Sequence, residues 1–303
     1  MKTSLHEKIR YMLNSGYNAE MAVYKLLSHQ LTDKAINEER SGVDGASSCG
    51  NSPLIVSLTT YGKRLRDVAP TVESIMQGSL KPSAILLHIS DELHDMPLPI
   101  ALQRQQQRGL QVVYCHDIGP FTKLVPALRS FPDATIITID DDALYAPDLV
   151  ENLVALHRQY PTDIISNRVH LITLDAKGRP KKYRQWQRNA NPEEPSPRVF
   201  LTGFGGVLYP PHCLPPETLD EAVFTRLCPR ADDVWFYAMA LLHGTPIRKG
   251  FTHSPIGEDL IINRNVQLTA LRRLNNHSSQ VNNDTQLEAV LTHFNLYDKL
   301  KAE

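Results

Sequence analysis

The stretch TIITIDDD, residues 135–142, decides the fold, because an apolar run ends there in three consecutive aspartates. Short apolar runs without polar alternation are typical of strands that are buried on both faces, as in parallel sheets. Similar runs occupy residues 54–58, 84–89 and 110–114. Strands of this kind that alternate with helices predict an α/β fold, with a mostly parallel sheet flanked by helices.

The segments between these runs carry apolar residues at helical spacing. They predict helices over residues 68–76, 99–108, 124–131 and 147–160. Pro147 stands at the start of the last helix, where the missing N–H group of a proline costs no hydrogen bond. Ligands of such sheets bind beyond the carboxyl ends of the strands, so functional side chains are expected in the loops that follow the strands.

The chain divides into three zones, and its 303 residues allow one large α/β domain or two small ones. Residues 1–50 are predicted to form an N-terminal helical extension, interrupted near Gly16, and a linker rich in Ser, Gly and Asn. The α/β pattern occupies residues 51–262. Residues 263–303 predict a polar C-terminal tail that is helical near residues 285–300 and packs on the α/β domain.

The composition excludes several classes of protein. With a formal net charge of -1 and a sequence pI of about 6.9, the chain lacks the basic excess that is typical of nucleic-acid-binding proteins. Its cysteines are far apart and form no CxxC pair, which argues against a zinc site or a disulfide framework. We see neither a signal peptide nor an apolar run near the roughly 18 residues that span a bilayer. The expectation is a cytoplasmic protein, soluble or attached peripherally to the inner face of the membrane.

Asp140, Asp141 and Asp142 form an acidic cluster at the end of the fourth predicted strand. Three adjacent carboxylates repel one another, so the cluster is costly unless water or a cation neutralises it. Carboxylate oxygens suit the hard cations Mg²⁺ and Mn²⁺, and Mg²⁺ usually completes its shell with phosphate oxygens and water. A solvated acidic turn that caps the next helix is the alternative, but the position at the ligand-binding edge of the sheet favours a divalent cation.

A second acidic pair, Asp232 and Asp233, precedes the apolar run of residues 234–242 (VWFYAMALL), which predicts a buried helix. Acids in a first helical turn complement the helix dipole, so capping alone explains the pair. The functional alternative is that one of them is a general base within hydrogen-bond reach of a reacting hydroxyl group. Upstream, residues 202–211 (TGFGGVLYPP) combine a strand pattern with glycines, which permit either close approach of a ligand or a bend.

Short motifs follow one another along the chain: SLTTY at residues 57–61, KP at 81–82, DDD at 140–142, GFGG at 203–206 and ADDVW at 231–235. In this order they resemble the bacterial glycosyltransferases of the GT-A fold, and most closely the family-2-like enzymes of surface-polysaccharide (lipopolysaccharide or capsule) biosynthesis. The resemblance covers about residues 53–253. It implies a GT-A-like fold, in which the aspartate triplet matches the Asp-x-Asp motif and the second acidic pair matches the catalytic acids.

The resemblance implies roles for the acidic residues. Asp140 would lie near the donor ribose or the metal ion, and Asp142 would bind the metal ion directly. Asp233, the second acid of its pair with Asp232, would be the base of an inverting displacement. His253 stands where many such enzymes have a late metal ligand, with an ordinary histidine at a strand end as the alternative.

The resemblance also implies a site for a nucleotide-sugar donor. The residues that would hold the donor are Thr59, Tyr61, Arg64, Lys123, Asp140 and Asp141. Lys123 would meet the diphosphate, or else be a solvated lysine at the start of a helix. Arg168 and His170 are candidates for the acceptor side. Tyr183 and Trp186 would stack on an acceptor sugar or, in the interpretation that we favour, pack inside the protein.

These features predict a metal-dependent, inverting glycosyltransferase that moves a sugar from a nucleotide sugar, a UDP-sugar by resemblance, to a saccharide or lipid-linked saccharide in polysaccharide or lipopolysaccharide biosynthesis. A sugar nucleotidyltransferase is one alternative, but residues 59–64 (TTYGKR) contain a single glycine where those enzymes have a glycine-rich phosphate loop. A phosphatase of the haloacid-dehalogenase type is another, but Leu144 replaces the threonine of Asp-x-Asp-x-Thr. A third is an inactive module that binds a glycan or a nucleotide.

Overall fold

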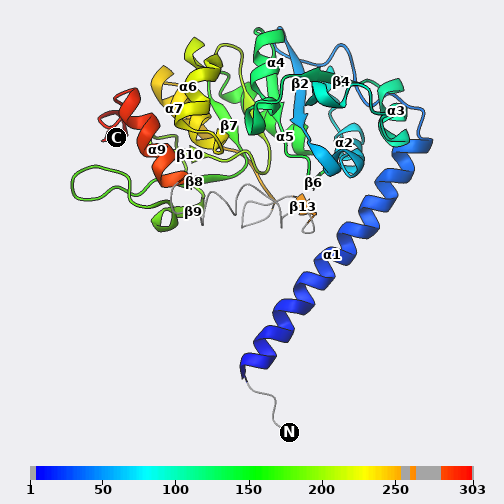
Figure 1. The fold of residues 1–303 in the computed structure, drawn as a ribbon, viewed down its shortest axis with the longest axis horizontal. Coiled ribbons are helices and arrows are strands. Elements are labelled where there is room, and N and C mark those ends of the chain that lie inside the picture. The colour runs from blue at the N-terminus through cyan, green and yellow to red at the C-terminus, as the bar shows by residue number, and fades with distance from the viewer. Residues whose placement is uncertain (1–4, 254–259, 264–280, 302–303) are drawn as a thin grey trace.

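The computed structural model describes residues 5–253, 260–263 and 281–301, and Figure 1 shows how their elements are arranged. A layered α/β body holds the sheets and most of the helices, and helix α1 (Leu5–Asn37) extends from it. α1 runs without a break, so the interruption predicted near Gly16 is wrong. One glycine costs a helix only about 1 kcal/mol relative to alanine, and a helix of this length tolerates that cost.

The main sheet has eight strands, in the order β12-β7-β11-β5-β2-β3-β4 with β1 paired to β2. The strands are β1 (Ser48–Cys49), β2 (Ser52–Thr59), β3 (Ala84–Ser90), β4 (Leu110–Cys115), β5 (Thr135–Thr138), β7 (Ile164–Ser166), β11 (Val207–Tyr209) and β12 (Ile247–Lys249). β2, β3, β4 and β5 pair in parallel, as do β7 and β12, whereas β11 is antiparallel to β5 and β7. The predicted mostly parallel sheet is confirmed, and all four predicted strands lie in it.

Helices cover both faces of this sheet. They are α2 (Ala69–Met76), α3 (Ile100–Gln107), α4 (Val125–Ser130), α5 (Leu149–Gln159), α6 (Glu221–Leu227), α7 (Asp232–His243) and α9 (Asn283–His293). Successive strand residues point to opposite faces. Ile136 therefore belongs to one buried cluster, which includes residues of α4, α6, α7 and α9, whereas Ile137 belongs to another, which includes residues of α2, α3 and α5. The helices predicted between the strands are confirmed.

Residues 202–211 contain a turn rather than one continuous strand. Gly205 and Gly206 have φ angles of +98° and +95°, which glycine adopts without strain. The turn separates β11 of the main sheet from a small antiparallel sheet in the order β10-β8-β9. That sheet consists of β8 (Val169–Leu171), β9 (Gln187–Ala190) and β10 (Val199–Leu201), and another pairs β6 (Ala143–Tyr145) with β13 (Leu260–Ile262).

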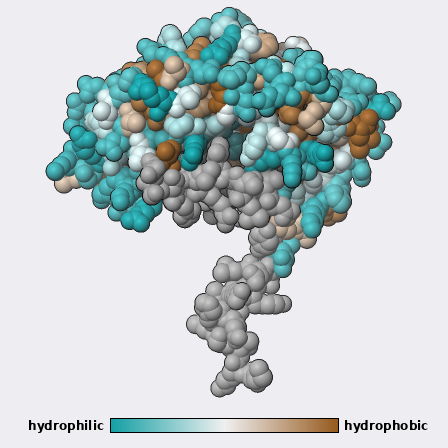
Figure 2. Space-filling model, in the orientation of Figure 1, coloured by the Kyte–Doolittle hydropathy of each residue, from teal (hydrophilic) through white to brown (hydrophobic). Residues whose placement is uncertain are grey.

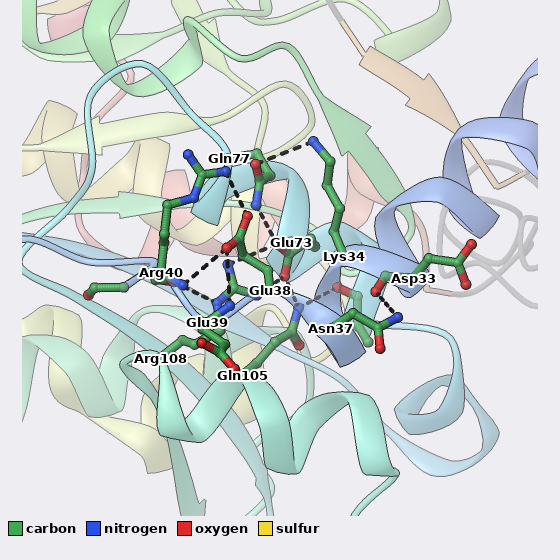
Figure 3. Close-up of polar contacts among 12 residues, drawn as sticks. Asp33, Lys34, Asn37, Glu38, Glu39, Arg40, Glu73, Gln77, Gln105 and Arg108 are labelled. Carbon is green, nitrogen blue, oxygen red and sulfur yellow. Dashed lines mark hydrogen bonds and ion pairs between the residues drawn. The ribbon is translucent and has the colours of Figure 1, made fainter.

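A buried polar cluster fixes the chain after α1 to the body (Figure 3). Arg108 donates two hydrogen bonds to Glu73, at 2.9 and 3.0 Å. Their side chains are only 3% and 0% exposed. Arg108 Nε also donates to the Arg40 carbonyl at 2.8 Å. The predicted linker also packs against the body, because Gly42 lies against Met76 of α2. The space between them is so small that a Cβ added to Gly42 would lie 2.4 Å from Met76 Cγ.

Hydrophilic residues predominate on the face of the body drawn in Figure 2, and hydrophobic residues are scattered among them. The exposed large apolar side chains include Val23, Leu26, Tyr61, Met96, Ile100 and Phe251. Within the described parts of the chain, none of the helices has an apolar stretch that would cross a bilayer.

Candidate active site

A cavity of about 650 Å³ opens beyond the carboxyl ends of β2, β5 and β7. Almost all of the residues predicted to bind the donor or the metal ion, or to act in catalysis, line this cavity: Thr59, Tyr61, Arg64, Lys123, Asp140, Asp141, Asp142, Asp232 and Asp233. His253 is not among the lining residues. Side chains from distant parts of the sequence therefore meet at the edge of the sheet where ligands of α/β proteins bind, which makes this cavity the candidate active site.

The aspartate triplet lies where the chain leaves β5. Thr60 Oγ1 and Arg64 Nη1 both donate to the Asp141 carboxylate at 2.6 Å. Arg64 Nη2 lies 3.4 Å from Asp142 Oδ2. Burial raises the pKa of Asp142 to about 7, and the negative charges of Asp140 and Asp141 add to this shift. The guanidinium group of Arg64 thus contacts the carboxylates of both Asp141 and Asp142. The three carboxylates of the triplet carry more negative charge than this one group neutralises.

Lys123 connects the two acidic clusters. Its Nζ lies 3.1 Å from Asp140 Oδ1 and 2.9 Å from Asp232 Oδ2, and its side chain is 11% exposed. Burial disfavours the ammonium group, but the carboxylates of Asp140, Asp232 and Asp233 outweigh this effect and raise the pKa of Lys123 well above its usual value. Gly203 gives the ammonium its space, because a Cβ there would lie 2.4 Å from Nζ.

Asp232 and Asp233 occupy the first turn of α7, as the sequence predicts. The Gly203 N–H donates to Asp233 Oδ1 at 2.8 Å, so this carboxylate bonds to a distant segment as well as facing the helix dipole. Burial raises the pKa of Asp233 to about 7, with a further contribution from the charge of Asp232. Burial also raises the pKa of Asp232, although Lys123 opposes that shift. Capping alone therefore does not describe the pair.

The chemistry of these side chains fits a hard divalent cation. Burial raises the pKa values of Asp141, Asp142, Asp232 and Asp233, and the neighbouring carboxylates add to this effect. Both acidic clusters together hold more carboxylates than Arg64 and Lys123 neutralise. Among the described residues, no three His, Cys, Asp or Glu side chains converge into a closed metal site. A magnesium-type ion needs only one or two protein carboxylates, because phosphate oxygens and water complete its shell.

The side of the cavity away from β2 is aromatic and basic. Arg168, His170 and Tyr183 line it, together with Phe200 of β10. Trp186 is 5% exposed and packs against the Phe200 ring at 5.1 Å, so the packing interpretation holds for Trp186. Sequence reasoning missed several lining residues, namely Arg188, Phe200, Arg230 and Asn283, and gave no role to Phe204 of the GFGG motif. The four missed residues belong to no motif, and the pairing of β8 with β9 and β10 brings Arg188 and Phe200 to the cavity.

His253 lies apart from these groups. Its Nε2 is 2.6 Å from Asp148 Oδ2, and its side chain is 60% exposed. The hydrogen bond with His253 lowers the pKa of Asp148. The role of His253 as a metal ligand stays a prediction.

Comparison with known proteins gives a limited result. No protein-family model matches the sequence. A search of curated proteins also finds no match. Among solved structures, the mannosyltransferase PcManGT from Pyrobaculum calidifontis in complex with GDP-Man and Mn²⁺ aligns with a TM-score of 0.42 and 16% identity, over 76% of this chain and 64% of that one. The CMP:2-keto-3-deoxy-manno-octonic acid synthetase complexed with CTP aligns with a TM-score of 0.41 and 13% identity, over 72% of this chain and 97% of that one. Likeness at this level leaves the reaction to be inferred from the site.

Proposed function

We propose that this chain is a GT-A-type glycosyltransferase that moves a sugar from a nucleotide-sugar donor, a UDP-sugar, to a saccharide or lipid-linked saccharide acceptor in polysaccharide or lipopolysaccharide biosynthesis. The observation that carries the proposal is the bridge that Lys123 makes between two acidic clusters in one cavity. One cluster suits a cation that binds a diphosphate, and the other suits removal of a proton from a hydroxyl group. Glycosyl transfer needs these two functions on either side of the anomeric carbon.

In this proposal Asp140 and Asp142 hold the divalent cation, Mn²⁺ or Mg²⁺. Such an ion, when bound, stabilises the negative charge that develops on the leaving diphosphate. Arg64 and Lys123 are the cationic side chains beside the same carboxylates, and we assign them to the diphosphate oxygens. Tyr61 is 48% exposed and has Arg64 over its ring at 5.2 Å, which leaves ring surface for the nucleotide base.

Asp233 is the base in this proposal. A base is most effective when its pKa lies near the working pH, and the pKa of Asp233 is about 7. The acceptor hydroxyl gives its proton to Asp233 while its oxygen forms the new bond to the anomeric carbon. The bond from that carbon to the diphosphate oxygen breaks, and its electron pair leaves with the nucleoside diphosphate. Attack from the face opposite the leaving group inverts the anomeric centre.

The first test is a screen of nucleotide sugars with Mn²⁺, Mg²⁺ or EDTA, read out as release of a nucleoside diphosphate and transfer of the sugar. We expect metal-dependent release from one donor. A parallel reaction with a nucleoside triphosphate and a sugar or sugar phosphate tests the alternatives. Formation of a sugar nucleotide with release of pyrophosphate would assign a nucleotidyltransferase, and release of inorganic phosphate from the sugar phosphate alone would assign a phosphatase.

The variant Asp233→Asn tests the assignment of the base. We expect transfer to fall by at least about 100-fold, because positioned proton transfer contributes that much, while the affinity for the donor stays within about twofold. Asp220→Asn is the matched control, since Asp220 caps α6 outside the cavity and asparagine caps a helix equally well. Near-normal turnover by Asp233→Asn would reject the assignment.

A further inference from the structure

The wall of the cavity opposite the nucleotide side is built from the small sheet of β8, β9 and β10. Val169 and Val199 of this sheet are fully buried in the core. The alternate residues His170 and Phe200, which are register partners, line the cavity instead. Arg168, two positions before His170, lines the cavity with them. The two-residue period of a strand thus presents one continuous face to the ligand.

The strand order places this wall on the acceptor side. Arg168 comes just after β7, and β7 is two strands from β5 on the side opposite β2. Neighbouring strands lie about 4.8 Å apart, so the chain after β7 is roughly 10 Å from the aspartate triplet. Thr59 and Tyr61, at the end of β2, lie on the other side of that triplet. An anion bound near Arg168 is therefore on the side away from the predicted nucleotide site.

Arginines supply the charge of this wall. Arg168, Arg188 and Arg230 all line the cavity. Arg168 lies over the Phe204 ring at 4.8 Å and its Nε donates to Asn189 Oδ1 at 2.8 Å. These contacts orient the planar guanidinium group.

Arg188 lies over the Tyr183 ring at 5.6 Å, in a similar arrangement. In the described parts of the chain, the acidic residues that line the cavity come from other segments: Asp117 after β4, the triplet after β5, and the pair in α7.

We infer that this wall binds an anionic group, a carboxylate or a phosphate, on the saccharide acceptor. The inference rests on the proposed function and adds the class of acceptor. Oriented guanidinium groups bind carboxylates and phosphates through two parallel hydrogen bonds. The acids around Asp233 repel an anion, so the anionic group settles on the arginines. The acceptor is thereby oriented, with a hydroxyl group toward Asp233 and its charged group toward the arginines of the small sheet.

The test measures binding of three related sugars to the donor-free protein by ligand-observed NMR: glucose, glucuronate and glucose 6-phosphate. We expect at least one anionic sugar to bind about tenfold more tightly than glucose. In Arg168→Gln and Arg188→Gln this preference should fall by about five- to tenfold each, as expected for a lost hydrogen-bonded charge. Arg184→Gln is the matched control, because Arg184 is an exposed residue of the same segment that does not line the cavity.

The outcomes separate this inference from the proposed function. Equal binding of all three sugars, in a protein that releases a nucleoside diphosphate from a donor, would keep the function and overturn the inference. A preference for anionic sugars that survives in both arginine variants would place the anion elsewhere, for example at Arg64, and would also overturn it. A preference that Arg168→Gln and Arg188→Gln remove, in a protein without donor turnover, would support the anion site and reject the glycosyltransferase.

Discussion

Lys123 keeps a positive charge inside the protein because carboxylates surround it. It forms ion pairs with Asp140 and Asp232, whereas Asp233 accepts a hydrogen bond from the Gly203 amide. Neighbouring acids with different partners take different roles, because their environments stabilise different protonation states. Lys123 opposes the effect of burial on the pKa of Asp232, whereas burial raises the pKa of Asp233 to about 7 and leaves this carboxyl group able to exchange a proton.

The pH dependence of transfer follows from this arrangement. The pKa of Asp233 is about 7, so the base is protonated and inactive at lower pH. We expect kcat/KM to fall about tenfold per pH unit below pH 7 and to level off above it. The measurement is a rate profile from about pH 5 to 9 with one donor and acceptor. A rate that does not change between pH 5.5 and 8 would contradict this assignment.

The same carboxyl group lowers stability at neutral pH. Its folded-state pKa of about 7 lies above the usual 3.8, so the unfolded chain releases the proton first and the free energy of unfolding falls as the pH rises between these values. Asp233→Asn removes the buried charge. We expect the variant to be more stable than the wild type at pH 8, by roughly 2 to 4 kcal/mol, and equally stable below pH 4. Urea denaturation at both pH values measures this, and a less stable variant at pH 8 would refute it.

Gly203 sets the position of Lys123. In Gly203→Ala the new Cβ would lie 2.4 Å from Lys123 Nζ and 3.1 Å from Asp233 Oδ1, so the ammonium group must move. We expect transfer to slow by about 10- to 100-fold, because small displacements in a site cost that much. Gly45→Ala is the control, since nothing lies within 4 Å of its added Cβ. Equal activity of the two variants would show that Lys123 needs no fixed position.

At the scale of elements, a buried ion pair joins α2 to the end of α3. Its partners are Glu73 in α2 and Arg108, which directly follows α3. Arg108→Met leaves Glu73 buried without its cation, and we expect a loss of about 3 to 5 kcal/mol of stability. The double variant Glu73→Met/Arg108→Met should be closer to the wild type, because it removes both charges together. Arg104→Met, on the exposed side of α3, is the control and should change stability by less than about 0.5 kcal/mol. Similar losses in Arg108→Met and Arg104→Met would mean that the pair adds nothing.

Sequence reasoning succeeds where local pattern decides the structure. The apolar runs at residues 54–58 and 135–139 are strands because both faces of the sheet are covered. The residues that follow these runs, Thr59 and Tyr61 after the first and the aspartate triplet after the second, lie in the cavity because it opens at the carboxyl ends of the strands. It fails where tertiary contacts decide. Arg188 and Arg230 reach the cavity through folding that no local spacing encodes. The turn at Gly205 and Gly206 depends on backbone angles that the strand pattern of residues 202–211 conceals.

The whole molecule places three chemical environments along one edge of the sheet. β2 and β7 lie on opposite sides of β5, with β11 between β5 and β7. Tyr61 and Arg64 therefore lie on one side of the aspartate triplet that follows β5, and Arg168 lies on the other side. A nucleotide and an anionic sugar would approach the acids from opposite directions, which is the geometry that an in-line displacement needs.

The carboxylates of the cavity also make nucleotide binding depend on a divalent cation. This dependence can be measured through the thermal stability of the whole protein. Carboxylates around Asp142 repel a diphosphate until a divalent ion is bound, so we expect UDP with Mn²⁺ to raise the Tm and UDP with EDTA to raise it much less. Ligand at 100 times its Kd adds about 2.7 kcal/mol to the free energy of unfolding, which corresponds to a rise of about 5 °C in Tm for a protein of this size.

In Asp142→Ala the part of the Tm shift that depends on Mn²⁺ should disappear, while the ligand-free Tm rises because a buried carboxylate that is repelled by its neighbours is gone. Asp220→Asn should behave as the wild type in this assay. An equal shift by UDP with EDTA and with Mn²⁺ would show that Arg64 and Lys123 alone bind the diphosphate, and Asp142 would then lose its role as a metal ligand.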